Sequence, residues 1–459
     1  MKLSQEVFAI PHGENFIVYA PLRGVIVLCN TSMVNLLHRL YGGDSSVLSN
    51  PVYAEAASSL HRAGLLIEGK ELEEETSLLE GEPISSNFAP TRVTFLVTTS
   101  CNLRCVYCYA SAGERHATIP FEICKAAIDL VVCNAADLNV ADCHIAFHGG
   151  GEPTMKMPLV RKCVEYARKR AKQQGIQSSF SIVTNGVLTD SQIEWLAANM
   201  SGISVSLDGP PDIQNSQRPL RNGRGSFEQV FGAIKKLERL GAHPFVRATI
   251  TNESVDRMRE ISRFFSEEFE TAEFQLEPVA VCGRCATTGY REPTVEEFVR
   301  GVEEAMEEAA KFGKKAVCSA ALETFPDLME AYCGVAAPNF AITPEGIVTA
   351  CYEVSLPSDP RGEFFYYGGY NWEGNCFDFD ESVIERLRSH VIQNIQRCRD
   401  CFCRWQCAGD CPVRSVWRSP ALTGDEDVDF RCQVTRELVK RRLARAVEEN
   451  MIGTKSFGS

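Results

Sequence analysis

TRVTFLVTTSCNLRCVYCYASAG, residues 91–113, is an apolar, β-branched run that leads directly into three cysteines. Cys101, Cys105 and Cys108 are separated by three and then two residues, and no further cysteine follows until Cys124. A four-iron cluster normally takes four thiolates and a structural zinc takes four ligands, so this set is one ligand short of either. A metal site with an open position is generally a reactive one. The stretch predicts a strand that ends in a reactive metal loop.

Similar runs recur after this strand, and amphipathic helical patterns separate them. They begin at Cys143, Ser178, Gly202, His243 and Ala272. The helical stretches include residues 121–136 and 227–241, and residues 294–313 are expected to form the last helix. Strand–helix units in series imply a parallel sheet. The sequence therefore predicts an α/β fold whose sheet is either open or curled into a partial (β/α)6 TIM-like barrel.

Four of the predicted strands end in distinctive loops. Besides the cysteine loop these are HGGGEPT at residues 148–154, TNG at 184–186 and SLDG at 206–209. In parallel α/β architectures ligands bind where the strands end. The three consecutive glycines are as consistent with a flexible turn, but glycine also lets the backbone approach a ligand closely. Beside a metal loop, we expect a ligand-binding site.

The regions on either side of this series have different patterns. Residues 1–80 contain a hairpin around Pro21 and Gly24, two helical patterns and a short strand, and an acidic segment at 70–87 is expected to be a linker. After about Lys314 the periodicity weakens and cysteines become frequent, as in a metal-stapled domain. We expect three domains, at residues 1–80, 91–313 and 314–445.

Composition excludes several classes of function. A formal net charge of −13 over 459 residues argues against nucleic acid as the main partner. No apolar run is long enough for a membrane helix, and the N-terminus lacks the apolar core of a signal peptide. We therefore expect a cytoplasmic protein, in which cysteines stay reduced. The 20 cysteines then indicate metal ligation or redox chemistry instead of disulfides.

The cysteine spacing, the aromatic Tyr107 before Cys108, and GGEP at the next strand end together resemble the radical S-adenosylmethionine (SAM) superfamily. The resemblance implies that Cys101, Cys105 and Cys108 hold a [4Fe–4S] cluster whose fourth iron binds SAM, so the missing ligand is the cofactor. It also implies that an electron from the cluster splits SAM into methionine and a 5′-deoxyadenosyl radical, which takes a hydrogen atom from the substrate. Zinc is the alternative for this loop.

The resemblance further assigns SAM contacts residue by residue. Tyr107 would lie near the adenine. The methionine moiety would meet Gly150, Gly151 and Glu152. The ribose or carboxylate would meet Asn185, Ser206 and Arg218. Asp208 is either part of this site or a turn residue ahead of Gly209 and Pro210.

Seven cysteines near the C-terminus resemble the SPASM domain, the auxiliary-cluster extension of some radical SAM enzymes. They are Cys333, Cys351, Cys398, Cys401, Cys407, Cys411 and Cys432. The resemblance implies two further [4Fe–4S] clusters: an outer one on Cys398, Cys401, Cys407 and Cys432, and an inner one on Cys333, Cys351 and Cys411. Zinc ribbons would leave three of these cysteines unexplained.

The inner set has three ligands where a full set is four. The nearest upstream cysteine is Cys318, and Asp327 lies closer. Either Cys318 completes the site, which we favour, or one iron is open and could bind a substrate thiolate. Cys282 and Cys285, just past the sixth predicted strand, are either structural or a redox or metal pair at the same face.

Residues 1–80 resemble, in topology only, the winged-helix domains that bind leader peptides by adding a strand to a sheet edge. The alternative is a module that caps the barrel. The combined resemblance implies a radical SAM/SPASM enzyme that cross-links, oxidises or epimerises a ribosomal precursor peptide, with an electron donor such as flavodoxin or ferredoxin and no nucleic acid or membrane partner. A radical SAM enzyme for a small molecule and a non-catalytic iron–sulfur electron carrier are the alternatives.

Overall fold

The computed structural model describes residues 1–81, 88–321, 328–334, 339–414 and 429–453. Its centre is a parallel sheet in which strands adjacent in the chain are adjacent in space. These strands are β6 (Arg92–Leu96), β7 (Asp142–His148), β8 (Gln177–Thr184), β9 (Gly202–Ser206), β10 (Phe245–Ile250), β11 (Glu273–Pro278) and β12 (Lys315–Val317). The six predicted strands are confirmed. The sheet continues into β12, which follows the helix expected to be last.

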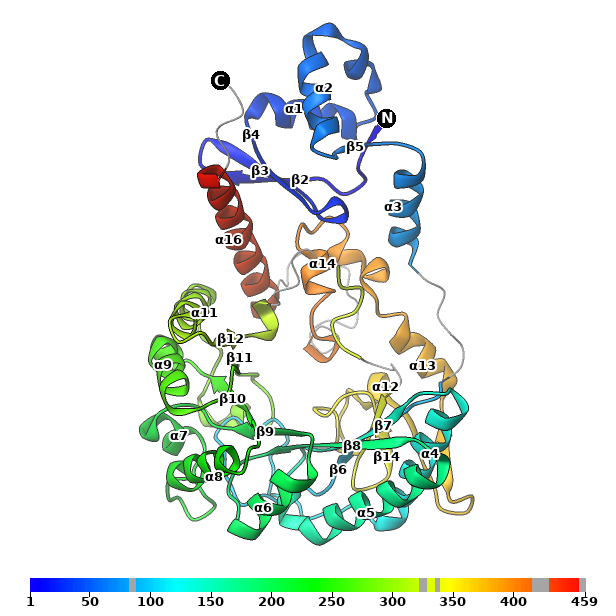
Figure 1. Cartoon of the computed structure of the whole chain (residues 1–459), viewed down its shortest axis with the longest axis vertical. Helices are drawn as coiled ribbons and strands as arrows, with labels where there is room; N and C mark the ends of the chain where they lie inside the picture. Colours follow the sequence, from blue (N-terminus) through cyan, green and yellow to red (C-terminus); the bar gives the residue numbers. More distant parts are fainter. Residues whose placement is uncertain (82–87, 322–327, 335–338, 415–428, 454–459) are drawn as a thin grey trace.

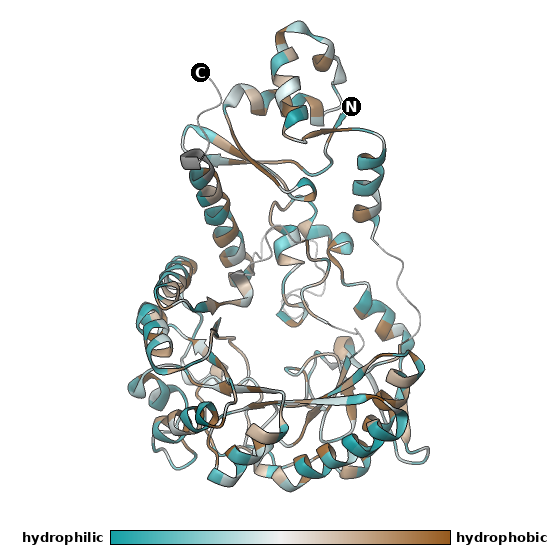
Figure 2. Ribbon diagram, viewed as in Figure 1, coloured by the Kyte–Doolittle hydropathy of each residue, from teal (hydrophilic) through white to brown (hydrophobic). Residues whose placement is uncertain are grey.

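Helices connect these strands and cover the outside of the curved sheet (Figure 1). They are α4 (Phe121–Asp137), α5 (Met157–Gln174), α6 (Asp190–Asn199), α7 (Pro211–Gln217), α8 (Phe227–Arg239), α9 (Met258–Glu268) and α11 (Val295–Ala310). Their apolar faces and the outward-facing strand residues form one core, in which Phe95, Val131 and Ile145 are fully buried. The opposite helix faces are hydrophilic (Figure 2), as expected of helices at a surface.

The C-terminal part of the chain extends the same sheet beyond β6. The strand β13 (Asn339–Ile342) pairs in parallel with β6, and β14 (Ile347–Thr349), β15 (Tyr366–Asn371) and β16 (Cys376–Phe379) follow as antiparallel neighbours. The helices that accompany them in the described part of the chain are α12 (Gly362–Phe365), α13 (Glu381–Arg388), α14 (Arg404–Cys407) and α16 (Phe430–Gly453). Strands from both sides of residue 313 therefore share one sheet, and the division into three domains stays a prediction.

The N-terminal part forms a small three-stranded antiparallel sheet in the order β2–β3–β4, from β2 (Phe8–His12), β3 (Asn15–Ala20) and β4 (Val25–Cys29). The predicted hairpin is confirmed, and Gly24 closes its turn with a φ of 62°. Two helices, α1 (Thr31–Tyr41) and α2 (Ala54–Arg62), pack on this sheet, and β1 (Lys2–Leu3) pairs with β5 (Leu66–Ile67).

The prediction of an acidic linker is wrong for residues 70–80, which form the helix α3 (Lys70–Glu80). Glu71 and Glu73 lie in its first turn, where the helix dipole favours negative charge. Glu75 is buried and accepts hydrogen bonds from Ser4 Oγ at 2.8 Å and from the Gln5 N–H at 2.9 Å. A contact with the N-terminus, distant in sequence, stabilises this helix.

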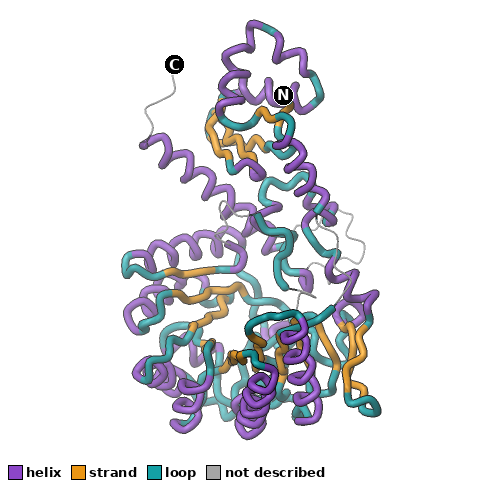
Figure 3. Tube along the Cα trace, turned by 45° about the vertical axis from the view of Figure 1, so that its right-hand side comes forward, coloured by secondary structure: helices purple, strands orange, loops and turns teal. Residues whose placement is uncertain are grey.

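The N-terminal domain lies at one end of the molecule and the large sheet at the other, with α14 and α16 between them (Figures 1 and 3). Among the described residues, no helix has the length and apolar character needed to cross a membrane.

Candidate functional site

A cavity of about 610 Å³ opens at the carboxyl ends of the parallel strands. The loops predicted to converge do so here, because residues of the cysteine loop, the glycine loop and the ends of β8 and β9 all line it. The lining contains every residue assigned above to a SAM contact: Tyr107, Gly150, Gly151, Glu152, Asn185, Ser206 and Arg218. Three cysteines of the C-terminal set line the same cavity.

Hydrogen-bond donors surround the sulfurs of the cysteine loop. The N–H of Leu103 lies 3.4 Å from Cys101 Sγ, the N–H of Ala112 lies 3.4 Å from Cys108 Sγ, and Asn185 Nδ2 lies 3.7 Å from Cys101 Sγ. Such donors favour the thiolate, which is the form that ligates metals. Burial raises the pKa of Cys101 to about 11 and that of Cys105 to about 12. Burial therefore disfavours the thiolate of Cys101 and Cys105, and a bound metal cation would favour it.

The glycine loop is pressed against the cysteine loop. A Cβ added to Gly151 would lie 2.2 Å from the carbonyl oxygen of Ser100, so no other residue fits there. The N–H of Glu152 donates to the same carbonyl at 2.8 Å. The glycines therefore serve a close backbone approach, which places the backbone of 150–152 beside the proposed cluster.

The buried carboxylate of Glu152 fixes this loop to the end of β8. Its Oε1 accepts from the Thr154 N–H at 3.1 Å, from Thr154 Oγ1 at 2.6 Å and from Thr184 Oγ1 at 2.8 Å, and its Oε2 accepts from the Asn185 N–H at 2.7 Å. Burial raises the pKa of this carboxyl group. Because Oε2 accepts only one of these hydrogen bonds, it could still accept another from a ligand in the cavity.

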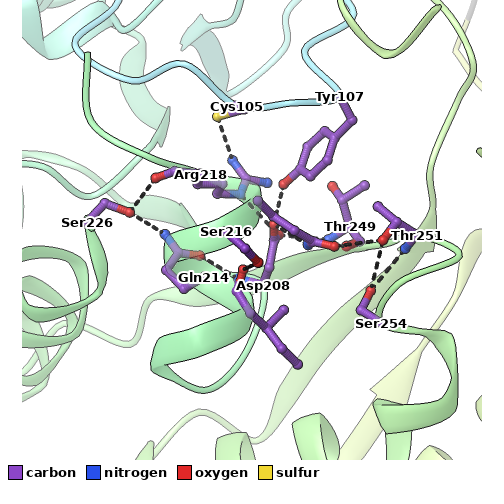
Figure 4. Close-up of polar contacts among 12 residues, drawn as sticks. Cys105, Tyr107, Asp208, Gln214, Ser216, Arg218, Ser226, Thr249, Thr251 and Ser254 are labelled. Atoms are coloured by element: carbon purple, nitrogen blue, oxygen red, sulfur yellow. Dashed lines mark hydrogen bonds and ion pairs between the residues drawn. The ribbon is translucent and has the colours of Figure 1, made fainter. Parts of the chain in front are cut away.

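Asp208 is fully buried at the end of β9 and organises one wall of the site (Figure 4). Its Oδ2 accepts hydrogen bonds from Tyr107 Oη and from Gln217 Nε2 at 2.8 Å, and its Oδ1 accepts from the Thr249 N–H at 3.0 Å. Arg218 Nε lies 3.0 Å from Oδ1, an ion pair that is not aligned as a hydrogen bond. Of the two readings of Asp208, the structure favours a buried acceptor that positions neighbouring site residues.

Arg218 connects this wall to the cysteine loop. Its guanidinium carbon lies 5.2 Å from the centroid of the Tyr107 ring, and its NH1 lies 4.0 Å from Cys105 Sγ. A cation near a thiolate stabilises its charge. Sequence reasoning placed Arg218 and Tyr107 in one site and named Asp208 as a possible member, but it did not find that this carboxylate contacts both.

The floor of the cavity is polar, and sequence reasoning named only Ser206 of its residues. Ser206, Arg247 and Gln275 lie side by side across β9, β10 and β11, in register, and all line the cavity. Among the described residues, no carboxylate forms an ion pair with Arg247. His148 also lines the cavity, with the ring of Tyr352 stacked 4.4 Å away and with no hydrogen-bond partner for its buried Nδ1. Burial, helped by Arg247, lowers the pKa of His148 to about 4.

The inner cysteines, Cys333, Cys351 and Cys411, line the same cavity as Cys101, Cys105 and Cys108. Burial raises the pKa of Cys351, and the nearby Glu353, Cys411 and Cys333 add to the effect. Cys318 is not in the lining and is packed in the core of the large sheet. Asp327 lies outside the described residues.

The outer cysteines, Cys398, Cys401, Cys407 and Cys432, form a second group outside the cavity lining. Burial raises the pKa of Cys432 to about 11, and the nearby Cys401 and Cys398 add to the effect. Within the described part of the chain, no three cysteine, histidine or acidic side chains converge tightly enough to hold a single metal ion.

The segment that contains Cys282 and Cys285 supports the cysteine loop. Arg284 donates from its N–H to the Cys108 carbonyl at 2.9 Å and from NH1 to the Cys105 carbonyl at 2.8 Å. Cys285 is buried, and Cys282 has Arg414 as a hydrogen-bond partner. These contacts favour the structural interpretation of this pair.

Residues 95–265 match the model of the Radical SAM superfamily. The Cysteine-type anaerobic sulfatase-maturating enzyme of Clostridium novyi (strain NT) is 25% identical over 174 residues, which cover 37% of this chain and 46% of that protein. Mycofactocin maturase MftC of Mycolicibacterium smegmatis is 28% identical over 179 residues, which cover 38% of this chain and 41% of that protein. The chain spans about half the length of the first curated relatives that it matches, between 46% and 56%.

Two solved structures have the same fold. Native anSMEcpe with bound AdoMet superposes with a TM-score of 0.60 at 18% identity, over 78% of this chain and 99% of that one. Streptococcus suis SuiB bound to precursor peptide SuiA superposes with a TM-score of 0.53 at 15% identity, over 94% of this chain and 99% of that one. The predicted α/β fold and the resemblance to radical SAM proteins of the SPASM and peptide-maturase type are confirmed.

Proposed function

We propose that this chain, whose residues 95–265 form a radical SAM domain, is an enzyme that cleaves SAM and modifies a ribosomal precursor peptide. The observation that carries this proposal is the shared cavity, which joins the radical SAM motif to three cysteines of the C-terminal set. A substrate in this space would be in reach of both. The modification would be a cross-link such as a thioether, an oxidation or an epimerisation.

The residues present fit the groups that the family implies, a [4Fe–4S] cluster and SAM. Cys101, Cys105 and Cys108 would hold the cluster, which supplies one-electron cleavage of SAM to a 5′-deoxyadenosyl radical. The donors directed at their sulfurs and the absence of any side chain at Gly151 support this assignment. The SAM contacts would come from Tyr107, Gly150, Gly151, Glu152, Asn185, Ser206 and Arg218.

The two further cysteine groups would hold two auxiliary [4Fe–4S] clusters. The inner one, at the cavity, would accept the substrate's electron or bind the substrate. An external donor such as flavodoxin or ferredoxin would deliver electrons, in keeping with a cytoplasmic protein whose 20 cysteines stay reduced.

The N-terminal domain would recognise the peptide. Its sheet has two edges, and neither pairs with another strand among the described residues. The edge strand β2 contains Pro11, whereas β4 reads VIVLC and carries neither a charge nor a proline. An edge strand without a charge or a proline can accept an additional strand. We expect an extended peptide to pair with β4.

The direct test is SAM cleavage by the anaerobically reconstituted, reduced protein. We expect 5′-deoxyadenosine, and roughly twelve irons per chain for three clusters. A variant with Cys101, Cys105 and Cys108 all replaced by alanine should keep about eight irons and form none of this product. If the wild type holds three clusters and still yields no 5′-deoxyadenosine, the proposed enzyme is in fact an electron carrier.

A radical SAM enzyme for a small molecule is the second candidate, favoured by the polar floor around Arg247. Short peptides encoded next to the gene discriminate between the two. A mass change in such a peptide that depends on SAM supports the maturase.

A further inference from the structure

We propose that the outer iron–sulfur site anchors the N-terminal domain, so that this domain is held in place only when the outer cluster is assembled. The inference rests on the proposed outer cluster at Cys398, Cys401, Cys407 and Cys432. It gives that cluster a mechanical role and Glu6 the role of a positioning residue. The outer cysteines do not line the cavity, so contact with the substrate does not account for them.

A buried ionic contact joins the N-terminal domain to the loop that carries three of the outer cysteines. Glu6 Oε1 accepts from Arg404 NH1 at 2.7 Å, and Oε2 accepts from Trp405 Nε1. Arg404 and Trp405 lie between Cys401 and Cys407 in the sequence. Trp405 is fully buried, and Glu6 and Arg404 are nearly so. The carboxylate therefore reaches into the loop that the cluster would fold.

Apolar packing fixes the same loop to the same domain. Cys403, which is buried and is not among the assigned ligands, packs with Ile10, Ile17 and Tyr19 of the small sheet. Cys403 directly precedes α14, so the start of this helix lies against the N-terminal domain, and Figure 1 shows α14 next to the small sheet. We therefore expect both the N-terminal domain and the proposed outer cluster to order the loop of residues 398–407.

The fourth outer ligand, Cys432, lies on α16, which packs against the small sheet as well. Val439, Leu443 and Val447, spaced four residues apart on one helix face, belong to the apolar cluster that contains Cys403. Figures 1 and 3 show α16 running from the N-terminal domain toward the large sheet. All four proposed ligands are thus on the two elements that hold the domain.

The energetic consequence follows from burial. Without the cluster, the cross-link from Cys432 on α16 to the loop of residues 398–407 is lost and only the apolar contacts around Cys403 remain, so the loop can relax. Glu6 would then keep a buried carboxylate without its partners, which is strongly unfavourable. The domain would be released from its position, and the orientation of β4 relative to the cavity would be lost.

Hydrogen exchange of the reconstituted full-length protein tests the inference. Cys407→Ser should lose about four irons and increase exchange across β2–β4, residues 8–29, by at least tenfold. Cys351→Ser, which affects the inner site, should also lose about four irons but leave exchange in residues 8–29 unchanged. Exchange across β6–β10 should stay at the wild-type level in both variants. This control would show that the rest of the chain is folded.

The positioning role of Glu6 has a separate readout. Glu6→Gln should increase exchange in residues 8–29 while the iron content stays at the wild-type value, and the exposed control Glu14→Gln should change neither. Cys432→Ser, on a different element, should repeat the result of Cys407→Ser. If either cysteine variant loses iron and residues 8–29 stay protected, the anchor is wrong. If neither variant loses iron, the outer cluster itself is wrong, and the anchor with it.

Discussion

Asp208 and Arg218 form an ion pair that is largely shielded from water. The side chain of Asp208 is 0% exposed, and that of its partner Arg218 is 11% exposed. Removing one member of a buried pair leaves the other charge uncompensated, which costs far more than the pair contributes. The exposed pair of Asp212 and Arg257, at 65% and 35%, is nearby and provides a natural comparison.

Asp208→Asn should therefore destabilise the protein by about 3–5 kcal/mol and weaken SAM binding at least tenfold, because Tyr107 and Arg218 lose the group that holds them. Asp212→Asn should cost less than about 1 kcal/mol and leave SAM affinity unchanged. Urea unfolding and calorimetric titration of the reconstituted proteins with SAM measure both effects. Equal losses in the two variants would contradict the role assigned to Asp208.

His148 makes stability depend on pH. Its pKa is lowered to about 4 in the folded protein, mainly by burial, whereas an unfolded histidine titrates near 6.5. The unfolded state then binds more protons below about pH 6.5, so the contribution is complete above that pH and is lost as the pH falls toward 4. The full loss is about 3 kcal/mol.

We expect the urea midpoint of the wild type to fall between pH 7 and pH 5 more steeply than that of His148→Gln, which lacks this titration. All other titrating groups are common to both proteins, so the difference isolates His148. Parallel curves would show that its ring is not kept neutral by the fold.

At the scale of elements, the position of Cys318 bears on the two alternatives for the inner cluster. Cys318 directly follows β12, is buried in the core of the large sheet, and is not among the residues that line the cavity with Cys333, Cys351 and Cys411. This position counts against Cys318 as the fourth ligand, and we expect an inner cluster with one open iron.

Cys318→Ala should accordingly leave about twelve irons per chain and an unchanged electron paramagnetic resonance spectrum of the inner cluster. Cys351→Ala, at a cavity-lining position, is the matched control and should lose about four irons and that spectrum. A loss of the inner signal in Cys318→Ala would instead identify this cysteine as the fourth ligand.

The elements themselves were predictable where the pattern is local. Period-two and helical patterns gave six strands, and Pro21 with Gly24 gave the hairpin. The three-residue strand β12 is too short to show a period. The helix α3 lacks a broad apolar stripe, and the burial of Glu75 against Ser4 supports it instead. The grouping of the C-terminal cysteines came from the resemblance to the SPASM domain.

At the scale of the whole molecule, the missed features are contacts between distant parts of the chain. Asp208 meets Tyr107 across 101 residues, and Glu6 meets Arg404 across 398. No local pattern encodes such a pair, because each residue is an ordinary charged or aromatic side chain until the fold brings the two together. Arg247 was also missed, because it lies within an apolar, β-branched run that predicts only a strand.

The molecule contains separate apolar clusters, so removal of the N-terminal domain should affect the outer cysteine site but not the core of the large sheet. The core of the large sheet contains no residue of the N-terminal domain among the described residues, whereas Cys403, Val439 and Leu443 share a cluster with Ile10 and Ile17. Deleting residues 1–67 would expose that cluster and leave Arg404 without its carboxylate.

We therefore expect the truncated protein to bind SAM with wild-type affinity but to lose about four irons, those of the outer site. Iron analysis and SAM titration after reconstitution measure the two quantities independently. A truncated chain that kept about twelve irons would mean that α14 and α16 fold around the outer cysteines without the domain. A chain that lost SAM binding as well would mean that the large sheet depends on the N-terminal domain through contacts beyond this apolar cluster.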